Sequence, residues 1–210
     1  MLSERDDILA RVRRGALRRA AHPGPHPAPA LPGGWEVFAA MLARVGGEAH
    51  GPFAPHTLGA ALAELVRLRA GGGRCVAEPS AAELAGRGPF ETARTPGAPH
   101  GFADVSVAIV RGHAAAADCA AVALVERDAP NRALPFLCQR LVLLLPVAAI
   151  HPDLHSAWAA LPETATRGHH VTWISGPSKT ADIEQALVIG AHGARSCTVL
   201  LVGASGPPAP

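Results

Sequence analysis

The chain has 210 residues, of which 49% are hydrophobic and 17% are charged, so it can bury a sizeable core. Its formal net charge of +2 is too small to predict nucleic-acid binding. The N-terminus lacks the apolar segment of a signal peptide, and the apolar stretch 141–150 is shorter than the roughly 20 residues of a membrane span. We therefore expect a cytoplasmic protein without a membrane span.

The first segment, residues 2–20, has the pattern of a helix. Ser3 is a candidate N-cap, and acidic residues occupy the first turns, where the helix dipole favours them. Arginines follow toward the C-terminal end and form a basic face, which is either solvated or a docking surface for a partner. Five prolines between residues 22 and 32 end this helix in an extended linker. The predicted organisation is an N-terminal arm at 1–21, a proline-rich linker at 22–34, an α/β domain at 35–203 and a disordered tail at 204–210.

Helical apolar spacing alternates with short apolar runs in the rest of the chain. Helices are predicted at 35–45, 56–70, 152–161 and 181–190. Strands are predicted at 48–50, 74–78, 103–110, 119–126, 139–146, 170–175 and 196–203. This alternation predicts an α/β sandwich with a mixed, mostly parallel sheet, and an antiparallel section would fall in the strand-rich stretch 103–145.

The four cysteines are far apart and form no Cys-x-x-Cys pair. They are Cys75, Cys119, Cys138 and Cys197. Such spacing argues against a zinc or iron–sulfur site on this chain, and so few cysteines in a chain of this length do not predict a disulfide framework. We expect no metal and no cofactor on this chain, and reduced cysteines in the core.

The turn 175–180 is the candidate binding site, because ligands of α/β sheets gather where strands end and helices begin. It contains Gly176, Pro177, Ser178, Lys179 and Thr180. Lys179 is the only lysine of the chain, and the N-terminus of the predicted helix 181–190 would favour an anion. Asp182 and Glu184 would already satisfy that helix dipole. The turn is therefore either an anion or carboxylate site or only a well-capped helix start.

Two further groups follow predicted elements without forming a recognised motif. His192 and Gly193 close the predicted helix, where His192 is either a surface histidine or an acid, base or ligand contact. Arg111, Gly112 and His113 follow the end of the predicted strand 103–110, where they could line the same cleft, but no role is assigned to them. The P-loop and dinucleotide-binding spacings do not occur in the turn, so no catalytic residue is assigned.

The stretch 174–202 resembles the C-terminal signature of the LUD-domain family, in the lactate-utilisation protein C group. That signature is G-P-S-x-T/S-A-D-I-E followed by V-x-G-x-H-G-P. The matching residues are Gly176, Pro177, Ser178, Thr180, Ala181, Asp182, Ile183, Glu184, Gly190, His192 and Gly193. Ala194 stands where the family usually has the final proline.

The resemblance implies a three-layer sandwich similar to the NagB/RpiA/CoA-transferase group. It also implies a non-redox subunit or accessory protein of L-lactate oxidation to pyruvate, with iron–sulfur clusters on partner proteins. The family's A-D/E-T-G-T turn corresponds here to 118–121, so Asp118 is the candidate pocket acid and the Thr-Gly-Thr part is lost. The second hypothesis is a stand-alone enzyme or binding module of the CoA-transferase-like fold for a phosphorylated, CoA-linked or carboxylate ligand. Either protein could form a homo-oligomer.

Overall fold

The structure, a computed structural model, describes residues 3–15, 24, 30–93, 98–167, 170–181 and 187–203. The chain divides into two compact units, residues 1–30 and 31–210. The predicted tail 204–210 and most of the predicted linker 22–34 lie outside the described residues.

The smaller unit contains helix α1 (Glu4–Gly15), of which no residue is buried. The backbone nitrogen of Asp6 donates to the hydroxyl of Ser3 at 3.3 Å, and that of Ser3 donates to the Asp6 carboxylate at 3.3 Å. This reciprocal pair is a capping box, so the prediction that Ser3 is the N-cap is confirmed.

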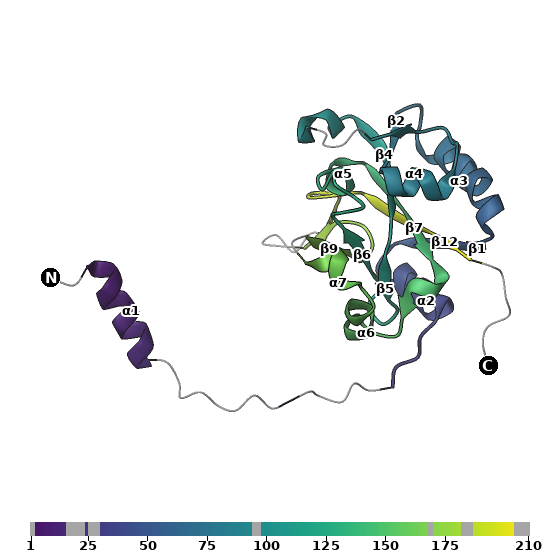
Figure 1. The fold of residues 1–210 in the computed structure, drawn as a ribbon. Helices are drawn as coiled ribbons and strands as arrows, with labels where there is room; N and C mark the ends of the chain where they lie inside the picture. The colour runs from purple at the N-terminus through teal and green to yellow at the C-terminus, as the bar shows by residue number, and fades with distance from the viewer. Residues whose placement is uncertain are drawn as a thin grey trace. The chain divides into compact units, whose positions relative to one another are not determined.

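A six-stranded parallel sheet forms the centre of the larger unit (Figure 1). Its strands, in spatial order, are β1 (Glu48–Phe53), β12 (Ser196–Val202), β7 (Arg140–Pro146), β4 (Val105–Arg111), β2 (Arg74–Ala77) and β3 (Glu91–Thr92). The central strand β7 is apolar without alternation because both of its faces are covered. Leu143 packs into one core cluster and Leu144 into the other, on the opposite face.

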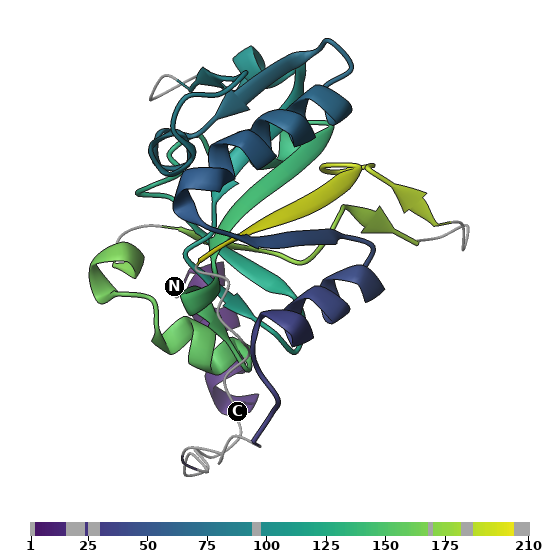
Figure 2. The same ribbon diagram turned by 90° about the vertical axis from the view of Figure 1, so that its right-hand side faces the viewer.

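Helices cover both faces of this sheet, as Figure 2 shows for α3 and α2. On one side lie α3 (Pro55–Arg69) and α4 (Pro79–Ala85), each with proline in its first turn, where the missing N–H has no helical partner. On the other side α2 (Trp35–Arg44) buries Phe38 and Leu42 completely. The predicted α/β class and three-layer sandwich are confirmed.

A second, four-stranded sheet packs on the α2 side of the parallel sheet. In spatial order it contains β8 (Ile150–His151), β5 (Ala114–Ala116), β6 (Ala121–Val125) and β9 (Val171–Ile174). The pairs β5–β6 and β6–β9 are antiparallel, so the expected antiparallel section exists. All three residues of β5 are alanines: Ala115 packs in the core between the two sheets, whereas Ala114 and Ala116 pack on the opposite face.

The outer face of the second sheet is covered by α6 (Leu154–Ala159), whose N-cap Asp153 accepts a hydrogen bond from the backbone nitrogen of Ser156 at 2.8 Å. The described part of the larger unit also contains four short helices: η1 (Pro99–Phe102), α5 (Leu134–Leu137), η2 (Val147–Ala149) and α7 (Glu163–Thr166). Among the described residues, none of the helices has the length and hydrophobicity that a membrane crossing requires.

The prediction of a helix at 181–190 is wrong at its described ends. Strands β10 (Lys179–Thr180) and β11 (Val188–Ile189) form an antiparallel pair there, and 182–186 lie outside the described residues. The backbone nitrogen of Gly190 donates to the carbonyl of Ser178 at 2.9 Å and extends the pairing. Val188 and Ile189 are each 49% exposed, so the apolar spacing that suggested a helix does not mark a buried face.

Candidate functional site

The turn 175–180 lies at the amino ends of the parallel strands. The backbone nitrogen of Ser178 donates to the carbonyl of Ala194 at 2.9 Å, and that of Arg195 donates to the carbonyl of Gln139 at 2.9 Å. Gln139 directly precedes β7, and Ala194 lies two residues before the start of β12. The expectation that this turn joins the ligand-binding carboxyl edge of the sheet is therefore wrong, because the preceding strand β9 belongs to the antiparallel sheet.

The backbone of the turn is held against the end of α2. Gly176 has a φ of 72°, and a Cβ added there would lie 2.9 Å from the carbonyl oxygen of Val45. Lys179 is exposed, and its Nζ would lie 2.7 Å from a Cβ added to Gly46. The ammonium group therefore lies beside the C-terminus of α2, where the helix dipole favours a cation.

The other predicted site residues near the turn differ in their surroundings. Pro177 is buried, Thr180 pairs with Val188 across the hairpin, and Asp182 and Glu184 lie outside the described residues. The last two residues of the turn form strand β10, residue 181 is in neither a helix nor a strand, and the next five positions of the predicted helix, 182–186, lie outside the described residues. The anion or carboxylate site at this turn stays a prediction.

His192 and Gly193 do approach the turn. A Cβ added to Gly193 would lie 3.2 Å from the Cβ of Ser178, while His192 is exposed. An open pocket of about 350 Å³ borders them. It is lined by Phe136, Leu137, Cys138, Gln139, Gly190, Ala191, His192, Gly193 and Arg195. Three matched positions of the signature, Ser178, His192 and Gly193, therefore meet at the amino edge of the sheet.

Asp118 lies in the turn between β5 and β6, which contacts the first residue of the 175–180 turn. The Ser175 hydroxyl donates to the carbonyl of Cys119 at 2.6 Å. Ala120 has a φ of 52°, a conformation that a non-glycine residue adopts at a cost of order 1 kcal/mol. The Asp118 Oδ1 atom is buried without a hydrogen-bond partner in the described structure. The two turns that the resemblance placed around one pocket are thus adjacent.

The carboxyl edge of the parallel sheet carries a separate polar cluster. Glu78 directly follows β2 and is fully buried, and its carboxylate accepts hydrogen bonds from Asn131 through the backbone nitrogen at 3.2 Å and through Nδ2 at 3.3 Å. Burial raises the pKa of Glu78, and the two hydrogen bonds from Asn131 oppose that rise. A buried carboxyl group with few donors is a common feature of functional sites.

A histidine–carboxylate pair lies beside this cluster. His113 Nε2 is 2.9 Å from Asp128 Oδ2, and the Ser80 hydroxyl donates to the Asp128 carbonyl at 2.7 Å. Burial lowers the pKa of His113, although Asp128 favours the imidazolium. Burial alone would raise the pKa of Asp128, but Arg127 and His113 together hold it below its ordinary value. A neutral imidazole bonded to a carboxylate is the expected state near pH 7.

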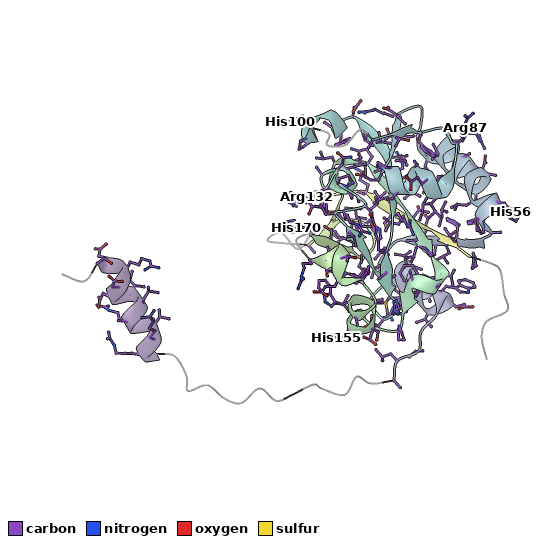
Figure 3. The ribbon with its side chains drawn as sticks, in the orientation of Figure 1. His56, Arg87, His100, Arg132, His155 and His170 are labelled. Carbon is purple, nitrogen blue, oxygen red and sulfur yellow. The ribbon has the colours of Figure 1, made fainter. Side chains whose placement is uncertain are left out.

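The loop 126–133 joins these groups and is fixed at its start by Glu126. Arg132 Nε lies 3.0 Å from one oxygen of this carboxylate, and the backbone nitrogen of His170 donates to the other at 2.9 Å. Figure 3 shows Arg132 and His170 at the same edge of the unit, and His155 far from both.

Sequence reasoning identified Arg111 and His113 as residues at a strand end but missed Asp128, the partner of His113, and the pair formed by Glu78 and Asn131. Glu78 and Asn131 are 53 positions apart, and no motif links them. The available signal was an acidic residue directly after the apolar residues 75–77 of a predicted strand, where the carboxyl edge of a parallel sheet was expected.

The model of the LUD domain matches residues 97–202, which is about half of the chain. The chain belongs to the LUD-domain family. The matched region runs from β4 to β12, so it contains Asp118, His113 and both turns, whereas Glu78 precedes it.

Curated relatives match a shorter region. Lactate utilization protein C of Geobacillus kaustophilus (strain HTA426) is 32% identical over 90 residues, which cover 41% of this chain and 38% of that protein. The proteins of the same name from Geobacillus sp. (strain WCH70) and Bacillus pumilus (strain SAFR-032) are 31% and 30% identical over 90 residues, and cover 37% and 38% of their own lengths. The chain thus spans well under half of the length of these relatives.

A solved structure has the same fold. The DUF162 family protein from Deinococcus radiodurans superposes with a TM-score of 0.62 over 80% of this chain and 96% of its own chain. Its sequence is 15% identical, so this likeness concerns the fold alone.

Proposed function

We propose that this chain is a non-redox component of a cytoplasmic L-lactate utilisation system, in which iron–sulfur partner proteins carry the electrons when lactate is oxidised to pyruvate. The observation that carries the proposal is the similarity to relatives named Lactate utilization protein C, within a chain of the LUD-domain family.

The state of the cysteines supports the assignment of the clusters to partners. Iron–sulfur ligation requires thiolates. Burial raises the pKa of Cys138 and of Cys197 to about 12, so both remain thiols at neutral pH. Burial also raises the pKa of Cys75 and of Cys119.

The role in lactate utilisation is tested by deleting the gene in the native host. We expect growth with L-lactate as the carbon source to be lost, and growth with pyruvate to be retained, because the proposed block lies before pyruvate. A plasmid copy of the wild-type gene should restore growth. Unchanged growth of the deletion strain on L-lactate would contradict the role.

The partners are tested by purifying the full-length tagged chain from lactate-grown cells. Co-purified proteins should give the visible absorption and electron paramagnetic resonance signals of iron–sulfur clusters, and cells grown without lactate provide the control. If the eluate from lactate-grown cells contains no iron, the partner proposal is wrong even where the growth defect is found.

A further inference from the structure

The open pocket of about 350 Å³ at the amino edge of the parallel sheet is lined by residues 136–139 and by residues of the segment 190–195, which we call the pocket loop. Its volume lies within the range of small-molecule sites in proteins, about 300–1,000 Å³. None of the described lining residues is acidic, whereas Arg195 and His192 are basic and exposed. The pocket is thus accessible, and its described charge favours an anion.

The backbone of the pocket loop is fixed at both ends. At its start, the backbone nitrogen of Gly190 donates to the carbonyl of Ser178 at 2.9 Å. At its end, the backbone nitrogen of Arg195 donates to the carbonyl of Gln139 at 2.9 Å, and the carbonyl of Ala194 accepts from the backbone nitrogen of Ser178 at the same distance. The loop is therefore held in place before a ligand arrives, which lowers the entropy cost of binding.

Three residues between these anchors offer unused backbone donors. Among the described residues, the backbone nitrogens of Ala191, His192 and Gly193 donate to no hydrogen-bond acceptor. All three residues line the pocket, and the backbone bends at His192 and Gly193. Successive free N–H groups in a bent segment are a common binding site for a carboxylate or a phosphate. The loop therefore supplies neutral donors for an anionic group.

The side chains of Arg195 and His192 add stronger donors to the same pocket. Neither side chain forms a salt bridge or a hydrogen bond with another described residue. A Cβ added to Gly190 would overlap the Cγ of Arg195, so the stem of the arginine packs on the start of the pocket loop. A guanidinium group stays charged and can bind a carboxylate or a phosphate through two parallel N–H groups. Arg195 is therefore the residue that selects an anion.

The other lining segment provides an apolar wall. Phe136 and Leu137 belong to α5, border the pocket and are 45% and 39% exposed. A Cβ added to Gly193 would lie 4.0 Å from Cδ1 of Phe136, so the aromatic ring lies beside the pocket loop. A ligand whose charged group binds the loop would bring its next carbons against this wall, and covering the exposed apolar surface is favourable.

We infer that this pocket binds a small organic anion, a carboxylate or a phosphate monoester that carries a short apolar chain. Arg195 and the free N–H groups of the pocket loop bind the charged group, and Phe136 contacts the chain. The inference rests on the lining of the pocket and not on the proposed role in lactate utilisation. It adds Arg195 and Phe136, which no sequence motif indicated, to the neighbourhood of the signature turn.

Calorimetry and ligand-observed NMR on the purified full chain test the site with four anions: hexanoate, hexyl phosphate, acetate and inorganic phosphate. At least one of the two six-carbon anions should bind, and the one that binds more tightly identifies the charged group. The matching anion without the chain should bind about tenfold more weakly, which corresponds to the burial of about two methylene groups. Hexanamide has the chain and no charge, and it should not bind. If neither six-carbon anion binds, or if hexanamide binds as tightly, the inference is wrong.

Two variants separate the roles of charge and chain. Arg195→Met should weaken the six-carbon anion at least about tenfold, because a charge-assisted hydrogen bond is lost, and Arg195→Lys should recover part of the affinity. Phe136→Ser should weaken the six-carbon anion and leave acetate or inorganic phosphate unchanged. Both side chains are exposed, so both variants should fold. A variant that merely misfolds would lose the short and the long anion alike.

Arg87→Met is the matched control for the loss of charge. Arg87 is also an exposed arginine, and it lines a different open pocket, of about 550 Å³, beside α4. The control should bind the six-carbon anion as the wild type does. An equal loss of affinity in Arg87→Met and Arg195→Met would show a general effect of net charge and would overturn the assignment of this pocket.

Discussion

At the scale of single residues, the carboxyl edge of the parallel sheet is defined by polar groups that are buried and only partly satisfied. Glu78 is fully buried and is held by two donors of one residue, Asn131. Burying a carboxylate is unfavourable, and the neutral form is favoured as a result. The LUD-domain model does not include Glu78, although it includes Asn131. The edge is thus built from both halves of the chain.

Glu78 should make the stability of the protein fall as the pH rises. Because burial raises its folded-state pKa above 4.5, its contribution to stability is fully present below the unfolded pKa and is lost as the pH rises through the folded pKa. The substitution Glu78→Gln keeps the shape and removes the titration. The difference in unfolding free energy between Glu78→Gln and wild type should therefore shift in favour of the variant between about pH 4 and pH 7.

Urea denaturation at both pH values measures this difference. Glu83→Gln is the matched control, because Glu83 is an exposed carboxylate in α4, the helix whose N-cap residue is Glu78. If Glu83→Gln changes with pH as Glu78→Gln does, the burial of Glu78 is not the cause.

At the scale of elements, the signature segment forms a tight turn and a two-stranded hairpin. An isolated hairpin is marginally stable in water, so contacts at its base must hold it. Those contacts are the bond between Ser178 and Ala194 and the close approach of Gly176 to the end of α2. The packing of this turn against α2 therefore requires a residue without a side chain at position 176, which is the physical reason for the glycine of Gly-Pro-Ser.

Gly176→Ala should lower stability more than an ordinary glycine substitution. A Cβ would be strained at a φ of 72° and would also lie 2.9 Å from the Val45 carbonyl oxygen, so we expect a loss of at least about 2 kcal/mol. Gly71→Ala is the control: its φ is 58°, but nothing lies within 4 Å, so about 1 kcal/mol is expected from the backbone alone. Chemical denaturation of both variants measures the losses, and equal values would show that the contact with Val45 is unimportant.

At the scale of the whole molecule, two core clusters on opposite faces of one parallel sheet give the larger unit its stability. Cys138 and Cys197 lie in the first cluster and are each 2% exposed. Cys119 is only half-buried and lies in the turn beside Asp118. The cysteines of this unit therefore differ in solvent exposure, and their reactivity should differ accordingly.

Alkylation of the native protein should follow this order. With a pKa of about 12, roughly one in 10,000 molecules of Cys138 or Cys197 is a thiolate at pH 8, and neither is accessible without unfolding. We expect iodoacetamide to modify Cys119 first, and Cys138 and Cys197 only in proportion to the unfolded fraction in urea. Peptide mass spectrometry measures each site, with Cys119→Ser as the control for assignment. Rapid modification of Cys197 in the folded protein would contradict the packing of this core.

The sequence by itself determined the α/β class, most of the strands and the family. These features are visible in local patterns: the apolar run 141–145, the helical spacing of 35–45 and the Gly-Pro-Ser signature. Each pattern reflects interactions within a single element. Only the tertiary structure decided that the signature turn lies at the amino edge of the sheet, and that strand β11 stands at 188–189, within the stretch predicted as a helix. The tertiary structure also showed that Glu78 pairs with Asn131. The order of the strands and the path of the chain decide which distant polar groups are buried together, and such contacts produce no repeating pattern in the sequence.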